Sequence, residues 1–391
     1  MKHIEGGICA VRGVKANGIK QGKNGLAVII SEARKRTSAG AFTRNKVIAA
    51  PLVITQEALV SGELKAVIAN SGCANAFTGE KGKLDARWMA GILAEKLNCA
   101  QNEIGVASTG VIGRYLDKDW IKEHLDEVLN GLSDSKEASK ACARAIMTTD
   151  TFVKEAAVEL DNGVRIGGIS KGSGMIAPDM GTMLAFLYTD AALSRETLNS
   201  CLKKAVDRSF NMVVVDGDTS TSDMALLTAT GYGECEEDVF QEGLDFVCIS
   251  LAKMIAKDGE GATRLIEARV KGALSEDDAR KAARAIVRSP LVKTAIFGKD
   301  PNWGRVVAAV GYSGAEVEQE RISLKFSDNK NEVALVTSGR IVVGKLEALK
   351  SIMESKEIVI EVALGLGDYE AIAWGCDLTY DYVKINAMYT T

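Results

Sequence analysis

Residues 164–190 read VRIGGISKGSGMIAPDMGTMLAFLYTD, two β-rich runs separated by a glycine-rich segment. The first run ends at Ser170, and the second begins directly after Gly181–Thr182. Apolar and β-branched runs bounded by glycines are typical of strands joined by loops. The pattern therefore predicts two strands, with a glycine–threonine pair at the entry of the second.

A glycine before a threonine at the start of a strand permits self-cleavage. Gly181 has no Cβ, so its peptide can adopt a strained geometry that exposes its carbonyl group. The Thr182 hydroxyl can then attack that carbonyl, and hydrolysis of the resulting ester breaks the chain. The new α-amine has a reference pKa of about 7.7–8.0, so it can act as base to its own hydroxyl. The alternative is a simple loop-to-strand junction.

A nucleophile that needs no histidine suits this composition. The chain has 391 residues with 2 His, the terminal His3 and His124 in a charged run that predicts a solvated helix face. A Ser-His-Asp triad, a Cys-His dyad or a His-ligated zinc would need one of them. The 8 Cys form no C-x-x-C pair, which predicts reduced, mostly buried thiols and neither a disulfide framework nor a metal site.

Charge and hydropathy exclude several classes of partner. Lys+Arg number 48 against Asp+Glu 52, and this balance provides no general field to attract nucleic acid or an anionic membrane. The longest apolar runs are strand-sized, well below the roughly 20 residues of a membrane span. The N-terminus, MKHIEGGICAVRG, lacks the apolar stretch of a signal peptide. We therefore expect a cytoplasmic protein.

Periodicity predicts the fold class. Helical spacing of apolar residues predicts helices over 84–97, 116–132, 135–147, 194–210, 240–258 and 275–289. Strands are predicted over 26–31, 64–70, 164–170, 183–189, 211–216, 263–270, 321–326 and 357–365. Ser194 and Ser275 are predicted N-caps. Because helix pairs and strand clusters replace a regular βαβ alternation, the order predicts a mixed α/β or α+β layered fold and not a Rossmann sheet.

Three further glycine-rich motifs suggest chemistry. In GVASTGVIGR (105–114), a short strand is expected before a turn in which a hydroxyl and a backbone N–H can stabilise an oxyanion; the alternative is a tight strand-to-helix connection. NMVVVDGDTSTSDM (211–224) has the D-x-D-x-T of phosphoaspartyl phosphatases or of a carboxylate Mg²⁺ site. It lacks a clear second carboxylate pair, which favours a turn with local side-chain hydrogen bonds. AKDGEGATR (256–264) is rich in glycine but lacks the Lys-Ser/Thr pair of a P-loop, so it does not predict a nucleotide site.

Several motifs together resemble the ornithine acetyltransferase (glutamate N-acetyltransferase) family of arginine biosynthesis. In chain order they are TSAGAFTRNKVIAAP, ASTGVIG, KGSGMIAP-x-M-x-TML, DGDTSTSD, KDGEGATR and CDLTYDYVKINAMYTT. The match runs from Gly6 to Thr391, essentially the whole chain.

The resemblance implies an α/β fold of the family's own, of the type with an N-terminal threonine nucleophile. Thr182 matches the nucleophile, released when cleavage after Gly181 gives an N-terminal chain, 1–181, and a C-terminal chain, 182–391. Thr109 and Gly110 match the oxyanion hole, so the N-terminal chain would carry both it and Lys171. The implied substrate contacts are Thr148 or Thr149, Lys171, Thr182, Glu260, Asn386 and Thr391. The family commonly has alanine where Gly181 stands, and we expect cleavage to persist because both residues are small.

The implied reaction is a ping-pong transfer of acetyl from N2-acetyl-L-ornithine to L-glutamate through acetyl-Thr182. Lys171 suits a substrate carboxylate and Glu260 an amine; the alternative for each is an ordinary surface charge in a flexible turn. The resemblance also implies a heterotetramer of two cleaved protomers and no metal or organic cofactor. Acetyl-CoA is a second donor in bifunctional members and not in monofunctional ones.

Two other hypotheses stay open on the sequence. The first is an N-terminal-nucleophile amidohydrolase or aminopeptidase that uses the same threonine with water as the acceptor. The second is an uncleaved amino-acid-binding protein without turnover.

Overall fold

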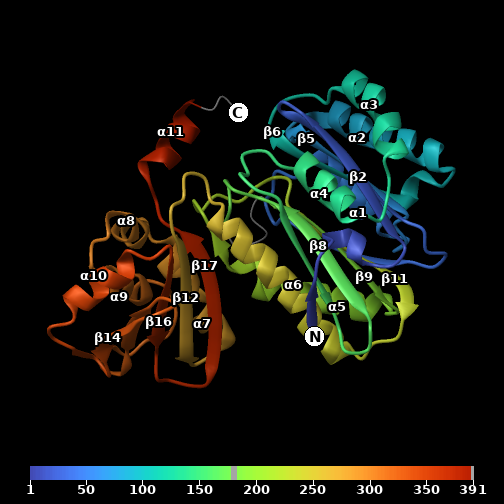
Figure 1. The fold of residues 1–391 in the computed structure, drawn as a ribbon. Coiled ribbons are helices and arrows are strands. Elements are labelled where there is room, and N and C mark those ends of the chain that lie inside the picture. The colour runs from blue at the N-terminus through green and yellow to red at the C-terminus, as the bar shows by residue number, and fades with distance from the viewer. Residues whose placement is uncertain (178–182, 389–391) are drawn as a thin grey trace.

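The computed structural model describes residues 1–177 and 183–388, and within them the strands form three sheets (Figure 1). Sheet A contains, in spatial order, β1 (Lys2–Ile4), β7 (Lys154–Glu159), β8 (Arg165–Lys171), β9 (Leu184–Ala191), β11 (Met224–Gly233) and β4 (Thr37–Phe42). Sheet B contains β2 (Val14–Gln21), β3 (Asn24–Ser31), β5 (Ala66–Cys73) and β6 (Ile104–Val111). Sheet C contains β10 (Val213–Val214), β17 (Tyr369–Cys376), β12 (Leu265–Ala273), β16 (Glu357–Ala363), β13 (Ser323–Ser327), β14 (Glu332–Thr337) and β15 (Arg340–Ile341).

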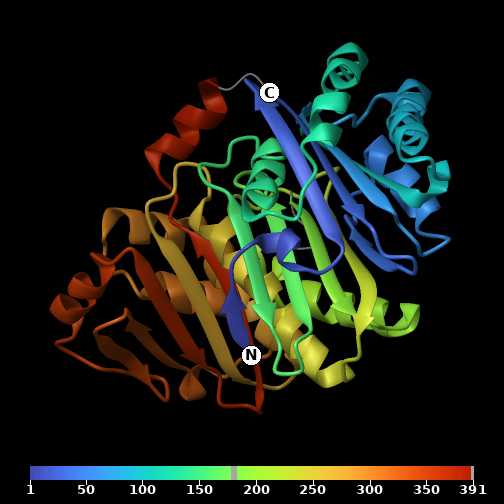
Figure 2. The same ribbon diagram turned by 45° about the vertical axis from the view of Figure 1, so that its right-hand side comes forward.

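The helices separate and cover these sheets (Figures 1 and 2). The outer face of sheet B packs on α1 (Ala50–Ala58), α2 (Gly79–Leu97) and α3 (Lys118–Asn130). Sheets A and B share a core that also contains α4 (Lys136–Ala145). The other face of sheet A packs on α5 (Arg195–Arg208) and α6 (Glu237–Lys257), in a core that continues into sheet C. The remaining helices are α7 (Glu276–Arg288), α8 (Pro290–Gly298), α9 (Gly304–Gly311), α10 (Leu346–Met353) and α11 (Tyr380–Met388).

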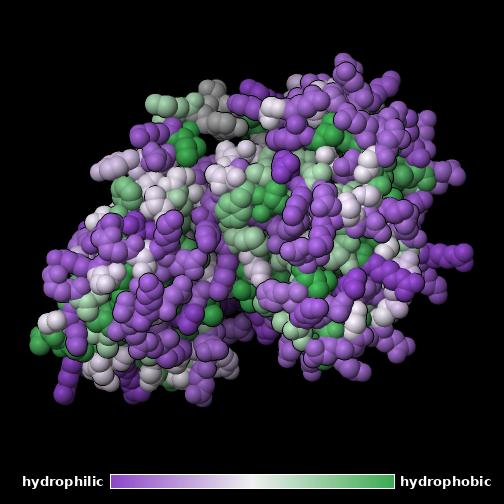
Figure 3. Space-filling view, in the orientation of Figure 1, coloured by the Kyte–Doolittle hydropathy of each residue, from purple (hydrophilic) through white to green (hydrophobic). Residues whose placement is uncertain are grey.

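Sheet A is the centre of this arrangement because both its faces are covered. All eight residues of β9 are buried, which explains why this strand is continuously apolar over LAFL and does not alternate. β9 pairs antiparallel with β8 and parallel with β11, so it lies inside the sheet. The outer surface in the view of Figure 3 is mostly hydrophilic, and its apolar side chains occur in scattered small groups.

The predicted mixed α/β fold is confirmed, and so are the six predicted helices and both serine caps. Ser194 Oγ accepts a hydrogen bond from Thr197 N–H at 3.1 Å, and Ser275 Oγ does the same for Asp278 N–H at 3.1 Å. The strand predicted over 211–216 is shorter than expected, because its first residues form a 3₁₀ turn and only β10 pairs with β17. The thiols are unpaired, and five of the eight are buried, as expected.

His124 was predicted on a solvated helix face, and that prediction is wrong. The residue is buried, with 9% of its surface exposed, on the side of α3 that faces sheet B. Its Nδ1 lies 2.8 Å from the carbonyl oxygen of Trp120, and its ring stacks on the Trp120 ring. The buried residues of α3 recur at helical spacing, and His124 lies next to Leu125 within that stripe.

Two of the helices that the sequence did not predict have a proline in their first turn. Pro51 is the second residue of α1, and Pro290 is the first of α8. Proline suits a first helical turn because its φ is already helical and its missing N–H has no acceptor there. Among the described residues, no helix is long and apolar enough to cross a membrane.

Candidate active site

A cavity of about 250 Å³ lies where the ends of sheets A and B meet the loop after α4. It is lined by all the described residues that the sequence assigned to substrate or oxyanion binding: Thr109, Gly110, Thr148, Lys171, Glu260 and Asn386. Thr149, the alternative to Thr148, also lines it. Gly181, Thr182 and Thr391 lie outside the described residues, so their roles stay predictions from the sequence.

Thr109 and Gly110 were expected in a turn after a short strand, but they belong to the end of β6 itself. β6 runs parallel to β5, and Gly110 is paired with Gly72 in that ladder. Gly110 has a φ of +129°, and a Cβ there would lie 2.5 Å from the carbonyl carbon of Gly72. Only glycine therefore fits, and the β6 backbone can reach the cavity at this point.

Lys171 is the last residue of β8, and it is buried, in contrast to the alternative of an exposed surface charge. Its Nζ donates hydrogen bonds to the Thr148 hydroxyl at 2.9 Å and to the Thr109 hydroxyl at 3.4 Å. Burial lowers the pKa of Lys171, and the Asp150 carboxylate 4.0 Å away opposes that effect. A buried ammonium bonded mainly to hydroxyls is suited to receive an anionic group of a ligand.

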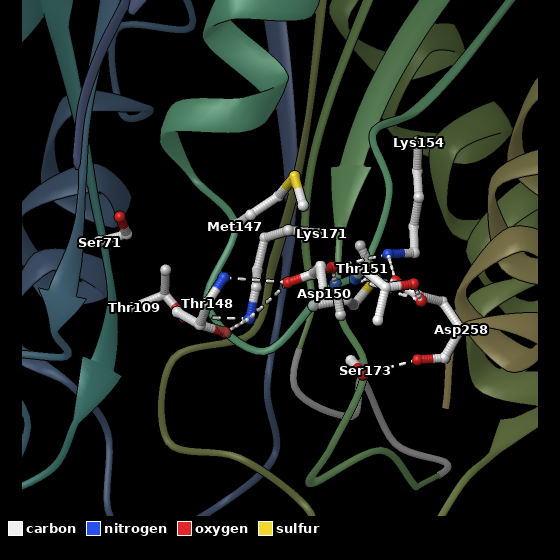
Figure 4. Close-up of polar contacts among 12 residues, drawn as sticks. Ser71, Thr109, Met147, Thr148, Asp150, Thr151, Lys154, Lys171, Ser173 and Asp258 are labelled. Carbon is white, nitrogen blue, oxygen red and sulfur yellow. Dashed lines mark hydrogen bonds and ion pairs between the residues drawn. The ribbon is translucent and has the colours of Figure 1, made fainter. Parts of the chain in front are cut away.

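Asp150 connects Lys171 to a second buried lysine (Figure 4). Its Oδ1 accepts a hydrogen bond from Lys154 Nζ at 2.7 Å and one from Gly172 N–H at 2.7 Å, and its Oδ2 accepts one from Thr148 N–H at 3.0 Å. Burial raises the pKa of Asp150, but the cations of Lys171 and Lys154 and the Gly172 N–H outweigh it and lower that pKa to about 2. Asp150 thus holds the end of β8 and the loop after α4 together.

Asp258 continues this network toward the opposite wall of the cavity (Figure 4). Its carboxylate accepts from Lys154 Nζ at 2.5 Å and from Thr151 N–H at 3.0 Å. Its carbonyl oxygen accepts a hydrogen bond from the Ser173 hydroxyl at 2.6 Å. The Ser173 carbonyl in turn accepts the N–H of Glu260 at 3.0 Å. The chain of contacts therefore fixes the position of Glu260 relative to β8.

Glu260 and Asn386 form the wall of the cavity opposite β6. Asn386 lies on α11, and its Nδ2 donates to Glu260 Oε2 at 2.8 Å. Gly174 leaves the room that this carboxylate occupies, because a Cβ there would lie about 2.4 Å from Glu260 Oε1. The cavity thus offers a buried cation on one wall and a carboxylate on another.

The sequence interpretation missed Lys20 and the three residues Asp150, Lys154 and Asp258. Lys20 Nζ donates to Ser71 Oγ at 2.7 Å and to Met147 O at 2.5 Å, which ties β5 to the loop before Thr148. Burial, together with the charge of Lys171, lowers the pKa of Lys20 to about 8. Asp258 lies within the quoted motif KDGEGATR, and Asp150 directly follows Thr148 and Thr149 in the sequence. Attention to acids beside these hydroxyls and glycines was therefore the available signal.

The D-x-D-x-T motif forms the expected turn, and its first aspartate also binds the backbone of the loop that follows β8. Asp216 Oδ1 accepts the N–H of Asp218 at 3.2 Å within the turn. Its two oxygens also accept the N–H groups of Met175 and Ile176 at 2.6 and 2.9 Å. Within residues 1–177 and 183–388, no group of three or more His, Cys, Asp or Glu is placed to hold a metal ion.

Known proteins resemble this chain over its whole length. The model of the ArgJ family matches residues 11–391. The glutamate N-acetyltransferase of Methanosarcina mazei is 62% identical over 100% of both chains, and the arginine biosynthesis bifunctional protein ArgJ of Archaeoglobus fulgidus is 51% identical over 98% of this chain and 100% of that one. A crystal structure of ArgJ from Bacillus halodurans is 41% identical with a TM-score of 0.50, over 52% of this chain and 98% of that chain.

We expect Asp150→Asn to destabilise the protein by about 3–5 kcal/mol at pH 7. The substitution leaves the buried Lys171 without its ion pair and the buried Lys154 with the carboxylate of Asp258 alone. The low pKa of Asp150 means that its stabilising effect is complete above pH 4 and is lost as the pH falls through 2. The free-energy difference between wild type and variant, measured by urea unfolding, should therefore shrink from pH 4 to pH 2.

Asp161→Asn is the matched control for this measurement. Asp161 forms an ion pair with the N-terminal ammonium at 2.6 Å, but its side chain is 93% exposed. An exposed pair of this kind contributes little, so the unfolding midpoint should not move. Equal stability of Asp150→Asn and wild type at pH 7 would contradict the role assigned to Asp150.

Proposed function

The chain belongs to the ArgJ family, and from that premise we propose that it transfers acetyl from N2-acetyl-L-ornithine to L-glutamate. The resemblance inferred from the motifs is thereby confirmed. Relatives that match its full length are named glutamate N-acetyltransferase, so the chain is an acyltransferase of arginine biosynthesis. The proposal also includes the ping-pong route, the roles of the site residues, the cleavage into two chains and the cytoplasmic location.

One observation supports the proposal most. Lys171, buried and bonded to two hydroxyls, lies in the same cavity as the Glu260 carboxylate and the Thr109–Gly110 strand end. N-acetylornithine and glutamate are both α-amino acids with a carboxylate for Lys171. The amine of glutamate or of the leaving ornithine suits Glu260. One pocket can therefore hold the two substrates in turn.

In the proposed mechanism, Thr182 Oγ takes the acetyl group from N-acetylornithine, and ornithine leaves. Glutamate then attacks the acetyl-threonine ester and departs as N-acetylglutamate. The α-amine of Thr182 accepts the proton of each attacking group and returns it to each leaving group. The Thr109 hydroxyl and the Gly110 N–H stabilise the negative oxygen of the tetrahedral intermediates. The reaction needs neither a metal nor an organic cofactor.

Two observations support self-cleavage into chains 1–181 and 182–391. The matched chain of the Bacillus halodurans protein corresponds to 52% of this chain, close to the 210 of 391 residues that follow Gly181. In addition, Lys171 and Leu184 are directly paired between β8 and β9. A break between these strands leaves both products in one hydrogen-bonded sheet, so the two chains can stay associated without a covalent link. We propose that two such cleaved protomers form the heterotetramer.

Denaturing electrophoresis of the purified protein tests the cleavage. We expect bands of about 19 and 22 kDa, obtained by sharing 41.6 kDa between 181 and 210 residues, and an N-terminal sequence Thr-Met-Leu-Ala for the larger. Thr182→Ala should give one band of full length, while Thr294→Ala, on the outer face of α8, should cleave like wild type. Two bands from Thr182→Ala would contradict the assigned nucleophile. Native mass spectrometry should give about 83 kDa, twice 41.6 kDa, for the heterotetramer.

An acetyl-transfer assay tests the activity. With N-acetylornithine and glutamate, we expect ornithine and N-acetylglutamate in equal amounts, with parallel double-reciprocal plots as a ping-pong route requires. Release of acetate without N-acetylglutamate would instead identify the hydrolase, and binding without turnover the amino-acid-binding protein. Replacing N-acetylornithine with acetyl-CoA separates a bifunctional enzyme from a monofunctional one.

Lys171→Met tests the carboxylate site. Loss of a charge-assisted hydrogen bond should lower kcat/KM for both substrates by about 10- to 100-fold, mainly through KM. Lys122→Met, at an exposed position of α3, is the control and should behave like wild type. Unchanged kinetics in Lys171→Met would remove Lys171 from the proposed site.

A further inference from the structure

Asp223 is a buried acid beside the proposed cleavage point that the mechanism above does not use. It directly precedes β11, and none of its surface is exposed. Its Oδ1 accepts the N–H of Met183 at 2.9 Å. The next residue, Met224, donates its N–H to the Met183 carbonyl at 3.1 Å. Met183 is therefore held on both sides of its backbone by Asp223 and its neighbour.

The second oxygen of Asp223 is the unusual feature. Oδ2 is buried and has no hydrogen-bond partner among the described residues. The hydroxyl groups of Thr43 and Ser220 lie near the Asp223 carboxyl group, but the Thr43 hydroxyl donates its hydrogen to the Ser220 carbonyl at 2.8 Å. A buried carboxylate oxygen without a partner is costly, so the neutral acid is favoured. Burial accordingly raises the pKa of Asp223 well above its usual value. The Met183 N–H, the charge of Lys171 on β8 and the hydroxyl groups of Thr43 and Ser220 lower it by smaller amounts.

The order of the chain places this acid next to the proposed break. Asp223 accepts the N–H of Met183, and Met183 directly follows Thr182 in the sequence. When the Thr182 hydroxyl attacks the Gly181 carbonyl, the Thr182 nitrogen must gain a proton to leave as an amine. A buried acid bonded to the backbone N–H of the next residue is suited to supply it.

We propose that Asp223 is the proton donor of self-cleavage, giving its Oδ2 proton to the Thr182 nitrogen as the bond to the Gly181 carbonyl carbon breaks. The Thr182 hydroxyl proton passes to water as Oγ bonds to that carbon, and water returns a proton to the carboxylate. A second water then hydrolyses the ester, which releases the Gly181 carboxyl group and restores the Thr182 hydroxyl. The inference rests on the proposed function, because it requires the break between Gly181 and Thr182.

Asp223→Asn separates this role from a purely structural one. The amide oxygen can still accept the Met183 N–H, but the amide is far too weak an acid to release a proton. We expect the variant to accumulate as full-length chain and to cleave about 100-fold or more slowly than wild type, the typical scale of general acid catalysis. Asp223→Glu, which keeps an acid, should recover part of the rate. Asp218→Asn, in the same turn but exposed, should cleave like wild type.

The outcomes distinguish this proposal from the proposed function. If wild type cleaves and a folded Asp223→Asn cleaves equally fast, the proton-donor role is overturned while the proposed function stands. If wild type stays intact, the cleavage part of the proposed function fails. Folding is checked by adding Asp223→Asn to Thr182→Ala, which keeps both precursors uncleaved. Equal melting temperatures of the single and double variants would exclude a folding defect.

A pH profile tests the proposal without any variant of Asp223. Wild-type precursor from cell-free translation is shifted to buffers of pH 5–9, and its cleavage rate constant is followed on gels. Loss of the hydroxyl proton makes the rate rise with pH, but a required acid stops that rise above its pKa. A break in the profile supports the proposal. A logarithm of the rate that rises linearly across the whole range overturns it.

Discussion

Lys154 and Lys171 are buried at one end of sheet A and need counter-charges. Asp150 contacts both lysines, and the rest of the candidate site depends on this interaction. Its carboxylate lies between Lys154 and Lys171 and also accepts two backbone N–H groups. Removing the charge of Asp150 would leave the buried Lys171 without an ion pair and Lys154 with Asp258 alone. The network therefore fixes the end of β8, the loop after α4 and, through Asp258, the start of the loop that carries Glu260.

The cavity exists because sheets A and B pack face to face. β6 brings Thr109 and Gly110 to it from sheet B, and β8 brings Lys171 from sheet A. Both sheets share one core with α4, so the two strand ends have a fixed separation. The same architecture gives β9 a protected place between β8 and β11. A chain that breaks ahead of β9 can then use the new end without losing the strand.

Local patterns predicted the elements well, and they failed where contacts between distant residues decide the outcome. The amphipathic spacing of α7 and its serine cap are properties of a dozen consecutive residues, so they can be recognised in the sequence. His124 lies among charged residues in the sequence, yet packing of α3 on sheet B buries it. In the sequence, Asp223 is simply an acid in a hydroxyl-rich turn. Its contact with Met183 spans 40 residues, so no local pattern indicates it.

The sequence by itself determined the fold class, the family and the motif residues, because periodicity and ordered motifs are local in the chain. It also indicated that catalysis has to proceed without histidine. Only the tertiary structure decided that Lys171 is a buried cation, that Thr109 and Gly110 end a strand, and that Asp150, Lys154 and Asp258 connect the walls of the cavity. Burial and charge pairing arise from residues as many as 104 positions apart, so no local pattern contains them.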